Sequence, residues 1–343
     1  MSLSLHVGDQ DVEILKLGSR ADVMQLGFVS DSLSHMGFED LLDTAVELGV
    51  SGIEINTGNW SSAPHFDIER MKSSKDARRQ FIDAFDTRGL ELIALNASGN
   101  QLHPSIGDQH SSVLHDTIRI AGDLSLKKVV LMSGLPGGGP GEMLPNWIIS
   151  SWPPETQTIL EWQWEQKLYP YWRALSEVAR ESGIEQLAIE MHGNQLVFNV
   201  PGLLRLRAEI GSVVGANLDP SHLFWMGADP LAAADALGPA IFHVHAKDTF
   251  LNPLKQATTS LLENGSLSDV AARSWSYTTI GFGHGEEWWR AFCYRLRLAG
   301  YDGWLSIEHE DIVLSRLEGL RKSVELLSGV IPKEQSDYAP QAV

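Results

Sequence analysis

Cysteine and positive charge are both scarce in this chain of 343 residues, and each shortage excludes a class of protein. Cys293 is the one cysteine, so an internal disulfide and a cysteine-based metal site are excluded, and a cytoplasmic location is expected. The 26 lysines and arginines are outnumbered by 44 acidic residues, which gives a formal net charge of −18. Because an acidic surface repels phosphate backbones, we do not expect nucleic acid as a partner.

Long apolar runs are missing as well. No 18 consecutive apolar residues occur, and the N-terminus lacks a basic segment followed by a long apolar one. We therefore expect neither a membrane-spanning segment nor a signal peptide, and no membrane partner. The 43% hydrophobic and 20% charged residues are typical of a globular protein with a sizeable core.

Short strand-like runs recur along the chain, and segments with helical periodicity separate them. The predicted strands are 24–30, 52–55, 90–96, 127–134, 187–192, 214–219, 241–248 and 303–310. The clearest helical segments, each ending in the glycine typical of a helix C-terminus, are 38–49, 76–89 and 286–300. Regular alternation of strand and helix indicates an α/β fold with a parallel sheet, and eight such units predict a single (β/α)8 TIM barrel.

The predicted barrel domain spans 24–330, with an N-terminal extension at 1–23 and a mobile C-terminal tail at 331–343. Two segments interrupt the alternation. Residues 134–160 are rich in glycine and proline, and residues 249–285 in serine, threonine, asparagine and glycine. Both follow predicted strands, so we expect long loops after strands 4 and 7 on the C-terminal face, where the active sites of barrels form.

The run IFHVHAKD at 241–248 alternates apolar side chains with histidines and a lysine. A period of two places His243, His245 and Lys247 on one face of the predicted strand. A histidine on a packed strand is often a hydrogen-bonded core residue, so a direct role for His243 stays open. Lys247 is a candidate catalytic residue, either in contact with substrate or as the counter-ion of a nearby carboxylate.

Carboxylates stand at the ends of other predicted strands. Asp219 follows Glu190 by 29 residues and His245 follows Asp219 by 26, and each interval matches one strand–helix unit. Glu308 lies 63 residues after His245, which the insertion after strand 7 explains. Burying carboxylates without a cation costs several kcal/mol each. A divalent cation resolves this deficit, and an oxygen-rich site with one nitrogen suits Mn²⁺, Mg²⁺ or Co²⁺ better than structural zinc.

Together these residues form the pattern Glu190 … Asp219-x-x-His222 … His245-x-Lys247-Asp248 … Glu308. The pattern resembles the xylose isomerase-like superfamily of sugar isomerases and epimerases, over roughly residues 24–328. The resemblance implies one divalent ion, Mn²⁺ before Mg²⁺ or Co²⁺, bound by Glu190, Asp219, His245 and Glu308. It also implies that the two glutamates exchange a proton with the sugar carbon and that His222 holds a substrate hydroxyl. Since His222 follows Pro220, capping the next helix is its alternative role.

Two features depart from the ketose 3-epimerases of that superfamily. The segment after His245 carries no arginine, and the loop after strand 4 carries tryptophans. The length and this loop are closer to a branch that acts on glycosides oxidised to a 3-keto form. That branch includes the metal-dependent C-glycoside deglycosidase catalytic subunits, which work with a smaller second subunit. Isomerisation, epimerisation and β-elimination all start with removal of a proton beside a polarised carbonyl, so all three reactions remain open. Assembly into a homo-oligomer or with a small second subunit also remains open.

Further candidates for binding the sugar or glycoside substrate lie after other strands: His192, His103, His65, Trp147 and Trp152. The tryptophans are suited to stack on a sugar face or an aromatic aglycone, and equally to anchor a partner subunit. The glycine-rich run GLPGGGPG lacks the ending of a phosphate-binding loop, and we interpret it as a flexible lid.

Two other functions compete with a sugar-active enzyme. One is a non-catalytic sugar-binding or assembly subunit that keeps the barrel. The other is a nuclease of the endonuclease IV type, which needs a basic groove that a net charge of −18 disfavours.

Overall fold

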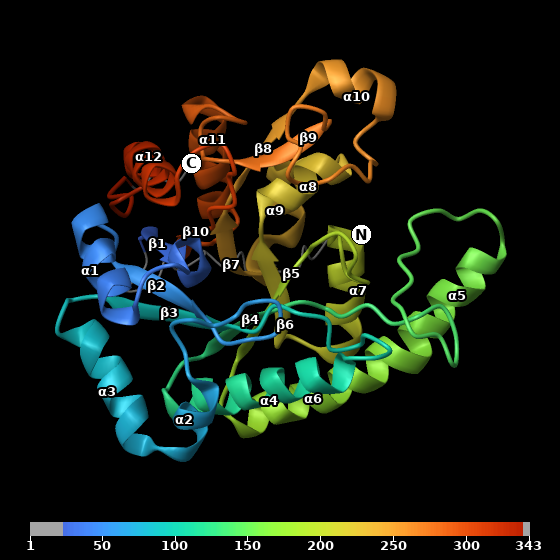
Figure 1. Cartoon of the computed structure of the whole chain (residues 1–343), viewed down its shortest axis with the longest axis horizontal. Coiled ribbons are helices and arrows are strands. Elements are labelled where there is room, and N and C mark those ends of the chain that lie inside the picture. The colour runs from blue at the N-terminus through green and yellow to red at the C-terminus, as the bar shows by residue number, and fades with distance from the viewer. Residues whose placement is uncertain (1–22, 339–343) are drawn as a thin grey trace, which may run out of the picture.

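The computed structural model describes residues 23–338, and in it eight parallel strands close into a barrel (Figure 1). The strands are β1 Gln25–Val29, β2 Gly52–Asn56, β3 Glu91–Asn96, β4 Lys128–Leu131, β5 Gln186–Glu190, β6 Val214–Leu218, β7 Ile241–Ala246 and β10 Trp304–Ile307. They pair in chain order around the barrel, and β10 closes it against β1. All eight predicted strands are present, which confirms the single (β/α)8 barrel.

Helices cover the outside of the barrel and bury its apolar surface. They are α1 Phe38–Leu48, α2 Ile68–Ser73, α3 Lys75–Asp86, α4 Gly107–Asp123, α5 Glu155–Gln163, α6 Tyr169–Glu181, α7 Val200–Ile210, α8 Pro220–Met226, α9 Pro230–Leu237, α11 Glu286–Leu298 and α12 Arg316–Val330. Each long helix buries one face; α1, for example, buries Leu41, Leu42 and Ala45 in the main core. Gly49 ends α1 in the left-handed conformation (φ 74°), as the sequence predicts.

The insertion after β7 is more ordered than the sequence indicates. It contains an antiparallel pair, β8 Asp248–Leu251 with β9 Trp275–Thr278, and a short helix, α10 Pro253–Thr259. The predicted strand 241–248 is therefore wrong at its end, since β7 stops at Ala246 and Asp248 begins β8. Between β4 and α5, residues 132–154 form a long loop without helix or strand. Both segments project beyond the barrel, in green and orange in Figure 1.

The predicted N-terminal extension and C-terminal tail lie partly outside the described residues. Most of the predicted N-terminal extension lies outside the described residues, and so do residues 339–343 of the predicted tail. Residues 331–338 contain no helix or strand, and their mobility stays a prediction. Within residues 23–338, no helix is long and apolar enough to cross a bilayer.

Candidate metal and catalytic site

Four side chains from four strands converge at the C-terminal end of the barrel. Glu190 is the last residue of β5, Asp219 follows β6, His245 is the penultimate residue of β7, and Glu308 follows β10. One ligand atom from each lies within 4.8 Å of those from the others. The structure therefore brings together the four residues proposed as metal ligands from the sequence.

Parallel pairing places these residues at the same height. Glu190 stands beside Asn217, two residues before Asp219, and His245 stands beside Ser306, two residues before Glu308. Asp219 is also the N-cap of α8, because its Oδ1 accepts a hydrogen bond of 2.8 Å from the Ser221 amide. Its second oxygen, Oδ2, is left to face the site.

Two buried atoms that could bind a metal ion, His245 Nδ1 and Asp219 Oδ2, make no hydrogen bond. His245 Nδ1 lies 3.4 Å from an oxygen of Glu190 and 3.4 Å from an oxygen of Glu308. A buried imidazole nitrogen and a buried carboxylate oxygen that lack hydrogen bonds are costly unless a cation lies between them. The residues present thus fit a divalent ion held by three carboxylates and one imidazole.

Lys247 neutralises part of this charge. Its Nζ lies 2.6 Å from Glu308 Oε2, 3.1 Å from Glu310 Oε2 and 3.3 Å from Asp219 Oδ2. Burial alone would lower the pKa of Lys247, but the three carboxylates, Glu308 first, hold it well above its ordinary value. The contacts of a counter-ion are therefore present, and a contact with substrate stays a prediction.

His222 joins the cluster from α8. Its Nε2 lies 2.8 Å from Glu190 Oε1 and 3.1 Å from Asp219 Oδ2, and its Nδ1 lies 2.9 Å from the Tyr277 hydroxyl. Burial would lower the pKa of His222, but Asp219 and Glu190 raise it to about 9. Because Asp219 is the residue that caps α8, the alternative capping role of His222 is wrong.

The carboxylates of the cluster remain ionised. Burial would raise the pKa of Glu190, but the hydrogen bond from His222 holds it well below its ordinary value. Burial likewise opposes ionisation of Glu308, and Lys247 outweighs this and lowers the pKa of that carboxyl. Both glutamates are therefore carboxylates that can accept a proton, and Glu308 is the more open of the two, with 21% of its side chain exposed.

His192 lies against the same group, and its ring centroid is 4.0 Å from that of His222. Burial first, and then the charge of His222, lower the pKa of His192 to about 4. It is thus a neutral imidazole beside a charged one. One of its nitrogen atoms, with Glu190 and His222, also lies within range of a common ion.

A pocket of about 620 Å³ opens over Glu308. The residues that line it include Asp31, Trp60, Val270, Tyr277, Glu308 and Glu310. Val270 and Tyr277 come from the insertion between β7 and α11, so this segment forms one wall of the pocket. The lining of the pocket combines aromatic, acidic and basic side chains, and the basic ones include Arg273 and Arg316.

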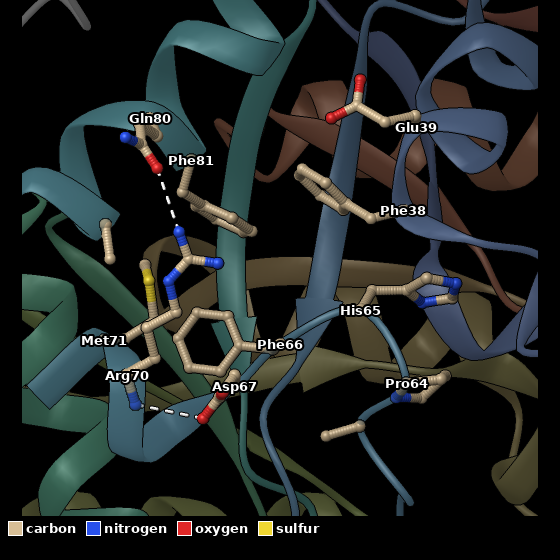
Figure 2. A pocket seen from close by; sticks show the side chains of 12 residues that line it. Phe38, Glu39, Pro64, His65, Phe66, Asp67, Arg70, Met71, Gln80 and Phe81 are labelled. Carbon is tan, nitrogen blue, oxygen red and sulfur yellow. Dashed lines mark hydrogen bonds between the residues drawn. The ribbon is translucent and has the colours of Figure 1, made fainter.

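Four of the predicted substrate-binding residues lie elsewhere. His65 lines a separate pocket of about 440 Å³ beside α1 and α3, where Phe38, Phe66 and Phe81 form the walls (Figure 2). His103 Nδ1 accepts a hydrogen bond from the Ser105 amide. The indole ring of Trp147 packs against Phe198 and Trp225, and Trp152 is 74% exposed on the loop before α5. None of these four lines the pocket over Glu308, and their roles stay predictions.

Three residues of the site were missed by the sequence analysis. Glu54, in the centre of β2, is fully buried and contacts His243 and His245. The sequence does carry a signal for Glu54, because it is a single carboxylate inside the apolar run GIEI. Glu310 repeats the alternation of Glu308, whereas Tyr277 lies in a segment with no recognisable pattern.

Comparison with known proteins gives one family and one close sequence relative. The family described as xylose isomerase-like TIM barrel matches residues 42–329. The uncharacterized protein YfiH of Bacillus subtilis (strain 168) is 44% identical over 311 residues, which cover 90% of this chain and 99% of YfiH.

Several solved structures share the fold. They include the probable 3-DHS dehydratase AsbF of Bacillus anthracis, involved in petrobactin synthesis (18% identity, TM-score 0.60, 89% of this chain and 99% of AsbF). A D-tagatose 3-epimerase-like protein has 19% identity and a TM-score of 0.58, with 89% and 99% coverage. The IolI protein, solved with a bound zinc atom, has 18% identity and a TM-score of 0.60, with 90% and 99% coverage. At such identities the similarity shows the fold alone.

Proposed function

Because the chain belongs to the xylose isomerase-like TIM barrel family, we propose that it is a divalent-metal-dependent enzyme that acts on a keto-sugar or keto-glycoside. The observation that carries the proposal is the buried cluster of Glu190, Asp219, His245 and Glu308, in which two donor atoms have no hydrogen bond. Three oxygen ligands and one nitrogen favour Mn²⁺, with Mg²⁺ or Co²⁺ as alternatives.

The proposed reaction begins with removal of a proton from the carbon next to a carbonyl. The bound ion supplies polarisation of that carbonyl, which acidifies the neighbouring C–H bond. Glu308 borders the open pocket and is kept ionised by Lys247, so it is positioned to take the proton. Glu190 is its acid/base partner in the cluster. Charged His222 contacts Glu190 Oε1 through Nε2 and the Tyr277 hydroxyl through Nδ1, so a substrate hydroxyl that binds His222 takes the place of one of these partners.

The fate of the enediolate determines the reaction class. A proton returned to the other face gives epimerisation, a proton on the neighbouring carbon gives isomerisation, and loss of a β-substituent gives elimination. An epimerase-like protein and a probable dehydratase share this fold, which supports the first and third outcomes. The finer proposal is elimination from a 3-keto-glycoside, as in C-glycoside deglycosidation. Trp152, Met143 and Leu144 are exposed on the same loop and suit contact with an aglycone or with a small second subunit.

Proton exchange with solvent tests the proposed activity. Metal-loaded protein is incubated in D₂O with free ketoses, inosose-type cyclitols and 3-keto-glycosides, and deuterium at the sugar carbon is followed by NMR. We expect exchange with one of these classes, reduced roughly 10²- to 10⁴-fold in Glu308→Gln. Binding of a sugar without any exchange would instead support the non-catalytic sugar-binding subunit.

Metal analysis tests the site itself. We expect about one divalent ion per chain, lost in Glu190→Gln and in Asp219→Asn. Glu310→Gln is the matched control, because Glu310 contacts the same Lys247 Nζ at 3.1 Å but is outside the four-ligand cluster. Full metal content in both ligand variants would refute the site.

A further inference from the structure

We propose that Glu54 positions the metal ligand His245 from inside the barrel, and that His243 and Lys128 hold Glu54 in place. The inference rests on the metal site proposed above and assigns a role to buried Glu54 and His243 and to partly buried Lys128, none of which is among the four ligands. They form a continuous hydrogen-bonded chain from β4 through β7 and β2 back to the ligand on β7.

Glu54 is the centre of this chain. Its Oε1 accepts from His245 Nε2 at 3.0 Å and from Asn96 Nδ2 at 2.7 Å, and its Oε2 accepts from His243 Nε2 at 2.7 Å. The side chains of Glu54, His243 and His245 have no exposed surface. A buried carboxylate held by three donors on its two oxygens is restricted in orientation, so it in turn orients the rings that donate to it.

The donors determine which nitrogen of each ring carries its proton. Because the Glu54 carboxylate can only accept, the facing Nε2 atoms of His243 and His245 must both be protonated. Lys128 Nζ lies 2.9 Å from His243 Nδ1 and can only donate, so that atom accepts and His243 is neutral. For His245, a proton on Nε2 leaves the lone pair on Nδ1, the atom that faces Glu190 and Glu308.

This arrangement is the carboxylate–histidine–metal geometry that fixes the orientation of a ligating ring and raises its basicity. Glu54, His243 and His245 also offer ligand atoms within 4.8 Å of one another and so resemble a second ion site. Their facing atoms are, however, already joined by contacts of 2.7–3.2 Å, and the Lys128 ammonium lies at the end of the chain. We therefore assign the group as a support for one ion, not as a site for another.

Metal affinity of Glu54→Gln tests the inference. The amide keeps the size of the side chain, but its NH₂ group cannot accept from an imidazole N–H, so one ring loses its acceptor. We expect the dissociation constant for Mn²⁺, measured by competition with a chelator, to rise roughly 10- to 100-fold. We also expect a changed visible absorption spectrum of the Co²⁺-loaded protein, which a structural effect far from the ligands would not produce.

Thr117→Val is the matched control. It removes a buried hydrogen bond of 2.8 Å to Thr57, directly after β2, without touching the chain of Glu54. We expect it to lower the stability of the metal-free protein while leaving both the Mn²⁺ affinity and the Co²⁺ spectrum unchanged. His243→Asn is the second variant, in case Glu54→Gln does not fold, and we expect a several-fold loss of affinity.

The outcomes separate this inference from the proposed function. A wild-type protein that binds no divalent ion refutes the metal site itself. One ion in wild type, with unchanged affinity and spectrum in Glu54→Gln and His243→Asn, refutes the positioning role alone. Two ions per chain in the wild type would overturn our assignment of the Glu54 group as a support.

Discussion

At the residue scale, Tyr277 links the insertion to the catalytic cluster. Its hydroxyl lies 2.9 Å from His222 Nδ1, its ring lies 4.7 Å from Lys247 Nζ, and it lines the pocket over Glu308. A histidine held at one nitrogen by Tyr277 presents its other nitrogen in a fixed direction. The insertion thus contributes to the geometry of the site as well as to the wall of the pocket.

We predict that Tyr277→Phe slows deuterium exchange into substrate roughly tenfold. A buried hydrogen bond to a charged group contributes about 1.5–3 kcal/mol, and a water molecule that enters in place of the hydroxyl replaces part of it. The metal content should not change, since Tyr277 is not among the four ligands. Exchange rates and metal analysis on the same preparation check this. An exchange rate equal to that of the wild type would show that His222 does not need this hydrogen bond.

His222 also predicts how the stability of the metal-free protein depends on pH. Its pKa is raised to about 9 in the folded chain, whereas an unfolded histidine titrates near 6.5. The charged form therefore stabilises the fold fully below pH 6.5, and this contribution is lost as the pH rises through 9. Integrated over the shift, it amounts to roughly 3 kcal/mol.

Urea unfolding in EDTA at pH 6 and at pH 9.5 measures this contribution. We expect the metal-free wild type to lose more free energy of unfolding between the two pH values than metal-free His222→Gln does. The variant serves as the control, because titrating groups that do not contact His222 contribute equally to both proteins. Equal losses would mean that His222 is not charged in the folded metal-free chain.

At the element scale, Asp248 attaches the end of the insertion to its beginning. This buried carboxylate, the first residue of β8, accepts from the amides of Gly281, Gly283 and His284 at 2.9–3.2 Å. It also lies 2.8 Å from the His284 ring. These contacts close a loop of more than thirty residues at its base, so the position of β9 and of Tyr277 depends on them.

We predict that Asp248→Asn loosens the insertion while the barrel stays folded. The amide has a single accepting oxygen. At the Oδ2 position it leaves the Thr249 amide without its acceptor, and at the Oδ1 position it leaves the Gly281, Gly283 and His284 amides without theirs, at a cost of about 1–3 kcal/mol for each unpaired group. Limited proteolysis should cut faster between residues 252 and 274, and hydrogen exchange should increase there first. Unchanged protection of this segment would contradict the role of Asp248 as its anchor.

The elements show what the sequence can predict and where it fails. The eight barrel strands are predictable because apolar runs bounded by helical patterns indicate buried parallel strands. The β8–β9 pair is not, because DTFL and WSYT are short and half-exposed and carry no clear alternation. Lys247 lies between β7 and β8, and its side chain contacts Glu308 as that of His245 does. This part of the site was therefore predictable although the strand boundary was not.

The same distinction holds for the site. Residues at the C-terminal ends of parallel strands meet by geometry, so Glu190, Asp219 and Glu308 can be found from strand boundaries. Glu54 cannot, because its partner His243 lies 189 residues further along the chain and inside the barrel. His65 follows a predicted strand on the correct face, yet the loop that carries it turns outward toward α1.

At the scale of the whole molecule, the single cysteine reports global unfolding. Cys293 is buried in α11, and burial raises the pKa of its thiol to about 12. Both features prevent reaction with a thiol reagent at pH 8, since the reactive thiolate is rare and inaccessible. Labelling must therefore wait until the barrel opens, and its rate follows the unfolding equilibrium when reclosing is fast.

A divalent ion held by four strands should suppress this opening. Because an ion that binds only the folded chain stabilises it by RT ln(1 + [M]/Kd), Mn²⁺ at about a hundred times its Kd should slow labelling of Cys293 roughly 100-fold, equivalent to about 2.7 kcal/mol. Glu190→Gln, which removes one of the proposed ligands, should show almost no slowing at the same concentration. Labelling by mass spectrometry with and without Mn²⁺ measures both. If Mn²⁺ does not change the rate of Cys293 labelling in the wild type, any bound ion lies outside the four strands whose opening exposes α11.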